Sequence, residues 1–362
     1  MCVPICFYLT FTLTSHRNCS EFFSGVEEKA QGGGRPAMLP FASDRGGAMD
    51  ARISLNFSIA KVIAIFTVVA GHWFSPSILW IPVTVGLFIF AFSSGYFTSL
   101  RYGADLDIGR FWRNKLERLG VRYCFILGFL AVVVMLRGGT LFHWHTLVHF
   151  FGLSGVLNWL DIRNRSGLGA GLWFFTLLLV FYAVYPLLAK LCRSKRHAAV
   201  AAVTSTAMAI YLEEHTNIGH ELWLTSLGFI LGVAYGMQGP TLRAWPAAAS
   251  AALGGTGLLV AHRTGFKGSN TTLIAITGIA CTIWLANATR VNWRGFSRLA
   301  RLEDYLLEIF LIHSYLFLHP SHDTLLDLSF SVIVIVAVAA GLHRTGNWIS
   351  SKIVSRRATA SA

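Results

Sequence analysis

From about residue 57 onward, the chain alternates long apolar runs with short polar segments. Several runs reach the roughly 18–20 residues that a helix needs to cross about 30 Å of hydrocarbon, where every backbone polar group must be satisfied internally. The pattern predicts an all-α, polytopic integral membrane protein with one transmembrane domain over 51–343. We expect about ten transmembrane helices, at 57–75, 79–100, 120–136, 172–189, 198–212, 222–238, 246–261, 271–289, 304–318 and 328–343.

The first fifty residues follow a different pattern. A short apolar run over 2–14 precedes a mixed polar stretch and the glycine triplet at 32–34. The run has no basic residue before it and no clear small-residue cleavage site, which argues against a signal peptide. We expect 1–50 to be a disordered extension, with Met38 or Met49 as the biological start.

Composition agrees with a membrane protein. Only 13% of the residues are charged and 54% are hydrophobic, whereas a soluble domain carries about a quarter charged residues. The net charge of +13 would suit nucleic-acid binding, but the basic residues lie between apolar runs and form no contiguous basic face. We therefore expect no nucleic-acid partner.

The basic residues instead indicate orientation. With the start of the first span in the cytoplasm, 22 Lys and Arg residues fall on the cytoplasmic side and five on the opposite side. Cytoplasmic loops of membrane proteins carry such an excess of positive charge. The bias predicts a multi-pass protein with both termini cytoplasmic, 344–362 as a basic cytoplasmic tail, and membrane lipids as partners.

The sequence offers little for a metal site. The cysteines show no C-x-x-C spacing, so we expect neither a disulfide nor zinc. His143 and His145 flank Trp144 without an obvious carboxylate partner, and the aromatic segment 141–160 is expected to form an amphipathic helix along the membrane interface. Walker, Rossmann, nucleophile-elbow and H-E-x-x-H motifs are all missing from the sequence.

An ionisable residue inside a predicted span costs several kcal/mol and marks a candidate functional position, and four stand out: Lys61, His72, Glu308 and His313. Lys61 and His72 are eleven residues apart, which places them within about 20° of one helix face and roughly 16 Å apart in depth. Glu308 and His313 differ by about 140°, so both cannot face the same partner helix. We expect Glu308 to neutralise Lys61 or Arg118.

Each of these residues also has a simpler interpretation. Lys61 can extend its ammonium toward the interface, and His72 can be a hydrogen-bonded structural histidine. Glu308 can pair with a basic residue only to hold two helices together. Similarly, Arg113, Lys115 and Arg118 on the cytoplasmic side can hold the phosphates of an anionic cofactor, or serve only topology and lipid contact.

With these residues in view, the chain from about 54 to 342 resembles the acyltransferase-3 family of bacterial membrane acyltransferases. The resemblance rests on five segments in order: Lys61 to Gly71-His72, Gly86 to Ser94-Gly95-Tyr96, Phe111 to Leu119, Leu172-Trp173-Phe174-Phe175 with Tyr185-Pro186, and Leu307-Glu308 to His313. Lys61 and Lys115 stand where the family usually has arginine, and Val121 and Arg122 replace its usual prolines. Lysine lacks the bidentate fork of arginine.

The resemblance implies an enzyme of the bacterial inner membrane that transfers an acetyl group from acetyl-CoA to a sugar hydroxyl. It implies His72 as the essential histidine, acting with Glu308 and His313, and a coenzyme A site formed by Lys61, Arg113, Lys115 and Arg118. The expected acceptor is an exopolysaccharide or its lipid-linked precursor, as in acetyltransferases of xanthan-type gums, in association with polysaccharide synthesis proteins.

Two mechanisms stay open at this point. His72 can act as a general base on the sugar hydroxyl, or it can form an acyl-imidazole that relays the group across the membrane. The alternative function is a transporter or flippase of a lipid-linked saccharide, in which the buried charges would line a path. Transporters often show repeated halves, and no internal repeat is visible in this sequence.

Overall fold

A computed structural model of the chain describes residues 51–360 apart from 76, 217, 219–221, 240–242, 267, 269, 289–294 and 322, with only the backbone at 351–360. All of these residues belong to one compact unit, 47–362. The predicted extension over 1–50 lies outside the described residues.

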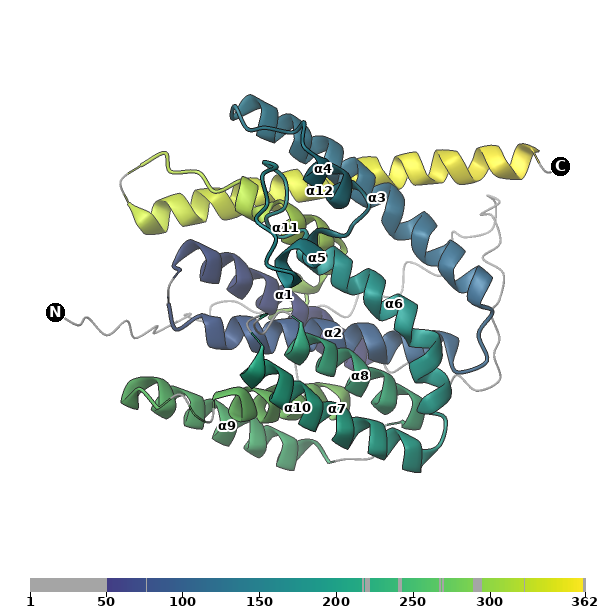
Figure 1. The fold of residues 1–362 in the computed structure, drawn as a ribbon, viewed down its shortest axis with the longest axis vertical. Coiled ribbons are helices and arrows are strands. Elements are labelled where there is room, and N and C mark those ends of the chain that lie inside the picture. Colours follow the sequence, from purple (N-terminus) through teal and green to yellow (C-terminus); the bar gives the residue numbers. More distant parts are fainter. Residues whose placement is uncertain are drawn as a thin grey trace, which may run out of the picture. The chain divides into compact units, whose positions relative to one another are not determined.

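The described residues form helices and no strands, which confirms the predicted all-α fold (Figure 1). The α-helices are α1 Ala51–Trp73, α2 Trp80–Tyr102, α3 Ile108–Leu136, α4 Trp144–Phe150, α5 Ser154–Trp159, α6 Trp173–Leu191, α7 Lys195–His215, α8 Trp223–Gln238, α9 Ala244–Thr264, α10 Asn270–Asn287, α11 Leu306–Ile312 and α12 Thr324–Ala360. Two 3₁₀-helices flank α11: η1 Leu299–Tyr305 and η2 His313–Tyr315.

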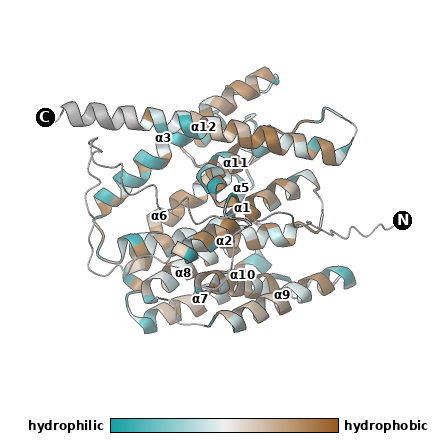
Figure 2. Cartoon of the chain, turned by 180° about the vertical axis from the view of Figure 1, so that it is seen from behind, coloured by the Kyte–Doolittle hydropathy of each residue, from teal (hydrophilic) through white to brown (hydrophobic). Residues whose placement is uncertain are grey.

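Seven helices in the described part of the chain are long and apolar enough to cross a membrane: α1, α2, α3, α6, α9, α10 and the first 27 residues of α12. Hydrophobic residues extend along much of these helices (Figure 2). The polytopic membrane architecture is therefore confirmed, whereas the predicted number of about ten spans is not. Of the other three predicted spans, α8 has 16 residues, α11 has seven, and α7 contains Lys195, Arg196, Glu213 and Glu214.

Helices α2 and α8 pack against each other through glycines. Gly228, Gly232 and Gly236 recur at every fourth position of α8 and face α2. A methyl group at Gly228 would lie 2.7 Å from the carbonyl oxygen of Phe88, and one at Gly232 would overlap the carbonyl oxygen of Phe92. Small residues spaced four apart allow two helix backbones to approach this closely inside a membrane.

Helix α1 lies between two groups of elements. It packs against α2 and α10, and also against η1, α11 and η2. The span predicted at 304–318 is not one continuous α-helix, because α11 covers only seven of its residues and lies between the two 3₁₀-helices η1 and η2. Side chains bond to its carbonyls: Arg122 Nη2 donates to the Asp304 oxygen (3.1 Å) and His313 Nδ1 to the Phe310 oxygen (2.7 Å).

The predicted interfacial helix over 141–160 is also wrong as a single helix. It is divided into α4 and α5 by a turn in which Gly152 has a φ of +73°, a conformation that glycine adopts without strain. Trp144 and Leu147 on α4 are exposed, whereas His145 and His149 are buried. Helix α4 therefore directs apolar side chains outward and imidazoles inward.

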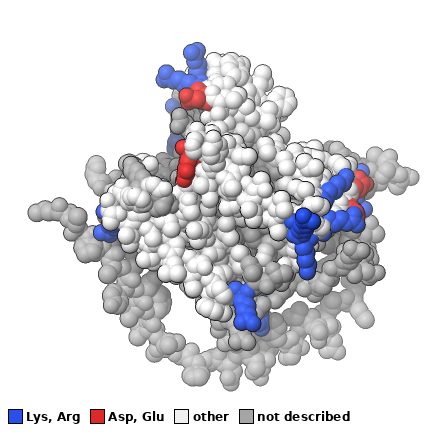
Figure 3. Space-filling model, turned by 60° about the horizontal axis from the view of Figure 1, so that its bottom comes forward, with Lys and Arg blue, Asp and Glu red and all other residues white. Residues whose placement is uncertain are grey.

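Charged side chains are unevenly distributed over the surface. On the face shown in Figure 3, Lys and Arg gather in separate groups with a few Asp and Glu, and most of the surface between these groups is white, without charged side chains. Such an arrangement suits a protein whose middle meets lipid and whose ends meet water.

Candidate functional site

His72 and His313 lie against each other. His72 comes at the end of α1 and His313 begins η2, and their ring centroids are 5.1 Å apart with a tilt of 41°. The His313 side chain is buried, whereas His72 is exposed. Among the described residues, no hydrogen-bond partner is seen for either ring nitrogen of His72. The structure thus brings together the two histidines that the sequence marked as candidates, and leaves one accessible.

The hydrogen bonds of His313 define its tautomer. Its Nδ1 lies 2.7 Å from the carbonyl oxygen of Phe310, which can only accept, so Nδ1 carries the proton. Its Nε2 then accepts from the hydroxyl of Ser314 at 3.1 Å. This assignment rests on the hydrogen-bond network. Both nitrogens of His313 are occupied, and its ring packs against that of His72.

Aromatic side chains extend the site beyond His72. Trp73 stacks on His319, with ring centroids 4.6 Å apart and an interplanar angle of 13°. Phe317 meets the Trp73 ring edge to face at 5.2 Å. Trp73 is half-buried and His319 is exposed. The accessible imidazole of His72 therefore lies next in sequence to a partly open aromatic surface.

The loop before α6 approaches the same site with glycines. Gly169 N donates to the hydroxyl of Tyr315 at 2.7 Å. A methyl group at Gly171, where φ is +72°, would lie 3.0 Å from the carbonyl oxygen of Phe310. Both the backbone angle and this close approach require glycine at 171. The loop thus fixes the backbone that carries His313.

A second buried histidine supports this loop. His149 Nδ1 lies 2.8 Å from Ser154 Oγ, and its Nε2 lies 3.2 Å from Asn164 Oδ1. The hydroxyl of Tyr123 donates to the His149 carbonyl at 2.6 Å. Burial lowers the pKa of the His149 imidazole, and the bond to Asn164 partly opposes this change. These bonds indicate a neutral imidazole that joins α3, α4 and the loop before α6.

Lys61 lies at the opposite end of the segment 299–315 from His313. Its ammonium forms an ion pair with Glu303 on η1, and the hydroxyl of Ser58 also donates to this carboxylate. The shared face predicted for Lys61 and His72 is confirmed, because η1 and η2 both pack on α1. The predicted pairing of Glu308 with Lys61 or Arg118 is wrong, since Glu308 turns to a different partner.

That partner is Arg122 on α3. Its Nε lies 2.8 Å from Glu308 Oε1 and its Nη2 lies 2.6 Å from Oε2, which is bidentate geometry. His343 Nδ1 on α12 lies 3.6 Å from Glu308 Oε1. Glu308 is 1% exposed. The simpler interpretation of Glu308, an ion pair that holds helices together, therefore fits its contacts, and it faces away from His313 as predicted.

The three basic residues expected to hold a cofactor differ in their surroundings. Lys115 is half-buried, and its ammonium lies 3.9 Å from the ring centroid of Tyr182, a cation–π contact. Arg113 and Arg118 are exposed. The two arginines are thus open to solvent, while Lys115 is held on an aromatic ring.

Sequence reasoning missed several residues at this site. Arg122 and Glu303 supply the ion-pair partners, and Ser314 and Tyr315 follow His313 directly. The spacing of Arg122 four residues after Arg118 was an available signal, because it places both on one face of α3. The pairing of Glu303 with Lys61 could not be predicted from the sequence, since Glu303 lies just before the predicted span.

Metal ligands do not gather in the part of the chain that the structure describes. No group of three or more His, Cys, Asp or Glu side chains is placed to hold an ion there. Cys124, Cys192 and Cys281 are free thiols.

Comparison with known proteins gives one match. Residues 55–342 match a family described as "Acyltransferase domain", which is the acyltransferase-3 family. The match includes both histidines, Lys61 and Glu308. No curated protein and no solved structure matches the chain.

Proposed function

The chain belongs to the acyltransferase-3 family of membrane acyltransferases, and from this membership we propose that it transfers an acetyl group from acetyl-CoA to a sugar hydroxyl. The observation that carries the site assignment is the accessible His72 held against the buried His313. Glu308, the other expected catalytic residue, is assigned to the support of α11 because Arg122 occupies both of its oxygens.

The proposed reaction uses His72 as the general base. A neutral imidazole nitrogen takes the proton of the sugar hydroxyl while the hydroxyl oxygen attacks the thioester carbonyl carbon. The tetrahedral intermediate then expels the coenzyme A sulfur, which receives the proton back from the imidazolium. The C–O bond forms, the C–S bond breaks, and the products are the acetyl ester and free coenzyme A.

The acyl-imidazole route is the alternative for the same residue. In that route His72 attacks the thioester first, and the sugar hydroxyl later accepts the acetyl group. It would suit a donor and an acceptor on opposite sides of the membrane. Both routes require an accessible imidazole at position 72.

The donor is expected on the cytoplasmic side, where Arg113 and Arg118 are exposed and available to phosphates. Lys61 and Lys115 are already engaged, by Glu303 and by Tyr182. We therefore assign the phosphate contacts first to the two arginines. Lys61 and Lys115 would contribute positive charge nearby.

The acceptor is expected at the other end of α1. Ligand sites combine aromatic surfaces with a few polar groups that fix orientation, and Trp73 with His319 supplies such a surface beside His72. A sugar ring stacked there would bring a hydroxyl toward the imidazole. We propose an exopolysaccharide or its lipid-linked precursor as acceptor, at the bacterial inner membrane with cytoplasmic termini, among polysaccharide synthesis proteins.

The experiment compares the acetyl content and the yield of the surface polysaccharide in strains that express wild type, His72→Ala or His215→Ala. His215 is an exposed histidine at the end of α7 and serves as the matched control. We expect His72→Ala to remove the acetyl groups at unchanged yield, because a positioned base contributes about 10²–10⁴-fold in rate. Normal acetyl content would reject the site assignment, and loss of polymer would favour the transporter.

A further inference from the structure

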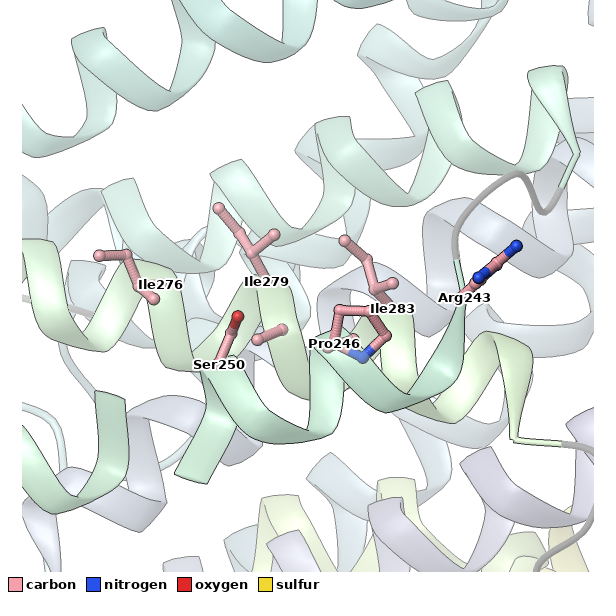
Figure 4. Close-up of a pocket in the computed structure, with 8 residues that line it drawn as sticks. Arg243, Pro246, Ser250, Ile276, Ile279 and Ile283 are labelled. Atoms are coloured by element: carbon pink, nitrogen blue, oxygen red, sulfur yellow. The ribbon is translucent and has the colours of Figure 1, made fainter. Parts of the chain in front are cut away.

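An apolar groove runs between α9 and α10, on a different side of α1 and α2 from the histidines. Its lining comprises Arg243, Pro246, Ala247 and Ser250 from the α9 side and Ile276, Ile279, Ala280 and Ile283 from α10. Figure 4 shows Arg243 at one end of this row, with Ser250 and Ile276 toward the other. Both helices are among those able to cross a membrane, so the groove lies on a lipid-facing part of the protein.

The Arg243 end of the groove has the features of a membrane interface. Arg243 is exposed, and Trp245, two residues later, is 70% exposed. Tryptophan is enriched at the level of lipid headgroups, and arginine at the cytoplasmic ends of spans. The remaining lining is aliphatic except for the hydroxyl of Ser250. The groove therefore offers a positive charge at headgroup level and hydrocarbon contacts deeper in the membrane.

The size of the groove fits one hydrocarbon chain. Its volume is about 350 Å³, at the lower end of the roughly 300–1,000 Å³ typical of ligand pockets. Ser250 follows Arg243 by seven positions, or about 10 Å along the axis of α9. A chain attached to a phosphate at Arg243 would reach past Ser250.

We propose that this groove binds one acyl chain of an anionic phospholipid, whose phosphate pairs with Arg243. Charge complementarity selects an anionic headgroup, because juxtamembrane basic residues attract such lipids with about 1 kcal/mol each. None of the lining residues belongs to the proposed acyl-transfer site. The opposite surface of α10 contacts α1, where Asn56 Nδ2 donates to the carbonyl oxygens of Leu285 (3.0 Å) and Ala288 (2.9 Å).

The test measures phosphatidylglycerol retained by the full-length protein after purification in mild detergent, by native mass spectrometry. Arg243→Ala removes the charge, and Ser250→Trp fills the groove from an exposed position. Arg263→Ala, an exposed arginine at the other end of α9, is the matched control. We expect Arg243→Ala to lower retention about fivefold, Ser250→Trp to lower it further, and Arg263→Ala to leave it unchanged.

A second measurement does not depend on copurified lipid. The melting temperature of each variant is compared in phosphatidylcholine nanodiscs with and without phosphatidylglycerol, because a ligand that binds the folded state stabilises it. The anionic lipid should raise the melting temperature of wild type and Arg263→Ala but not of Arg243→Ala. Equal retention or equal stabilisation in all variants overturns the proposal. Retention of a polyprenyl phosphate in place of phosphatidylglycerol overturns the assignment to a phospholipid.

Discussion

Two helix interfaces in this protein are formed by opposite kinds of residue. Helices α2 and α8 meet through Gly228, Gly232 and Gly236, with backbone against backbone and few polar side chains between them. Helix α1 meets the segment 299–315 through ionisable side chains, with an ion pair at one end and two imidazoles at the other. The first interface leaves little freedom for movement, and the second leaves an accessible side chain.

The comparison indicates how the two tasks are divided. Small residues permit dispersion contacts along the full helix length without a polar cost. Ionisable residues in a membrane are expensive, and they persist where they support another charge or do chemistry. Within the segment 299–315, Glu303 and Glu308 have basic partners. On the facing helix α1, no hydrogen-bond partner of the His72 ring is seen among the described residues. The proposed reactivity therefore lies at one end of this interface.

The largest effect is expected at the buried ion pair. Glu308→Ala leaves the Arg122 charge buried without its partner, which costs about 3–5 kcal/mol. The free energy of unfolding in mixed detergent micelles measures this loss. The double variant Glu308→Leu/Arg122→Leu should recover most of it. Wild-type transfer by the double variant would establish a structural role, and a stable but inactive double variant would return Glu308 to the chemistry.

A smaller loss is expected at the glycine interface. Gly232→Ala places a methyl group on the carbonyl oxygen of Phe92, and such overpacking costs about 1–3 kcal/mol. Gly255→Ala on α9 is the control, because its added methyl group meets no atom within 4 Å. That change should stabilise the helix by up to about 1 kcal/mol. Equal unfolding free energies for both variants would mean that α2 and α8 do not touch here.

His313 should affect rate more than stability. In the variant His313→Asn, the ring that packs on His72 is lost, and we expect acetyl transfer to fall about tenfold to a hundredfold as positioning is relaxed. His72→Gln should fall further, since it removes the proposed base. Steady-state transfer to a soluble acceptor with purified enzyme compares the two. A larger loss at His313 than at His72 would exchange their roles.

The smallest effect is expected at Lys61. Its side chain is 14% exposed and that of Glu303 is 35% exposed, so the pair is partly screened by solvent and contributes about 1 kcal/mol or less. Lys61→Met should lower the unfolding free energy by no more than this, and Lys61→Arg should restore it. A loss of transfer in Lys61→Met at normal stability would instead give Lys61 a direct part in donor binding.

Sequence patterns predicted the membrane class and the all-α fold because long apolar runs leave few alternatives to helices. Side-chain spacing also predicted that Lys61 and His72 share a face, and that Glu308 and His313 point apart. The ion-pair partners were missed because they depend on tertiary packing. Arg122 on α3 is far in sequence from Glu308, and Glu303 on η1 is far in sequence from Lys61. The helix breaks around α11 were missed because no Gly or Pro occurs between 299 and 318 to indicate them.

The glycine interface was missed for a different reason. The repeat Gly228, Gly232 and Gly236 is present in the sequence, but only the close approach of the α2 backbone in the fold identifies it as an interface. Helix α8 shows that an apolar run can predict a span where the helix itself is too short, since its 16 residues are too few for a full crossing.

The break at the end of α11 has an electrostatic consequence for catalysis. Peptide dipoles in a helix align, so the carbonyls of its last turn present partial negative charge. Helix α11 ends at Ile312, immediately before the histidine that touches His72. In the proposed reaction, an imidazolium formed at His72 would lie near this partial negative charge. The charge would stabilise the protonated ring until the coenzyme A sulfur leaves.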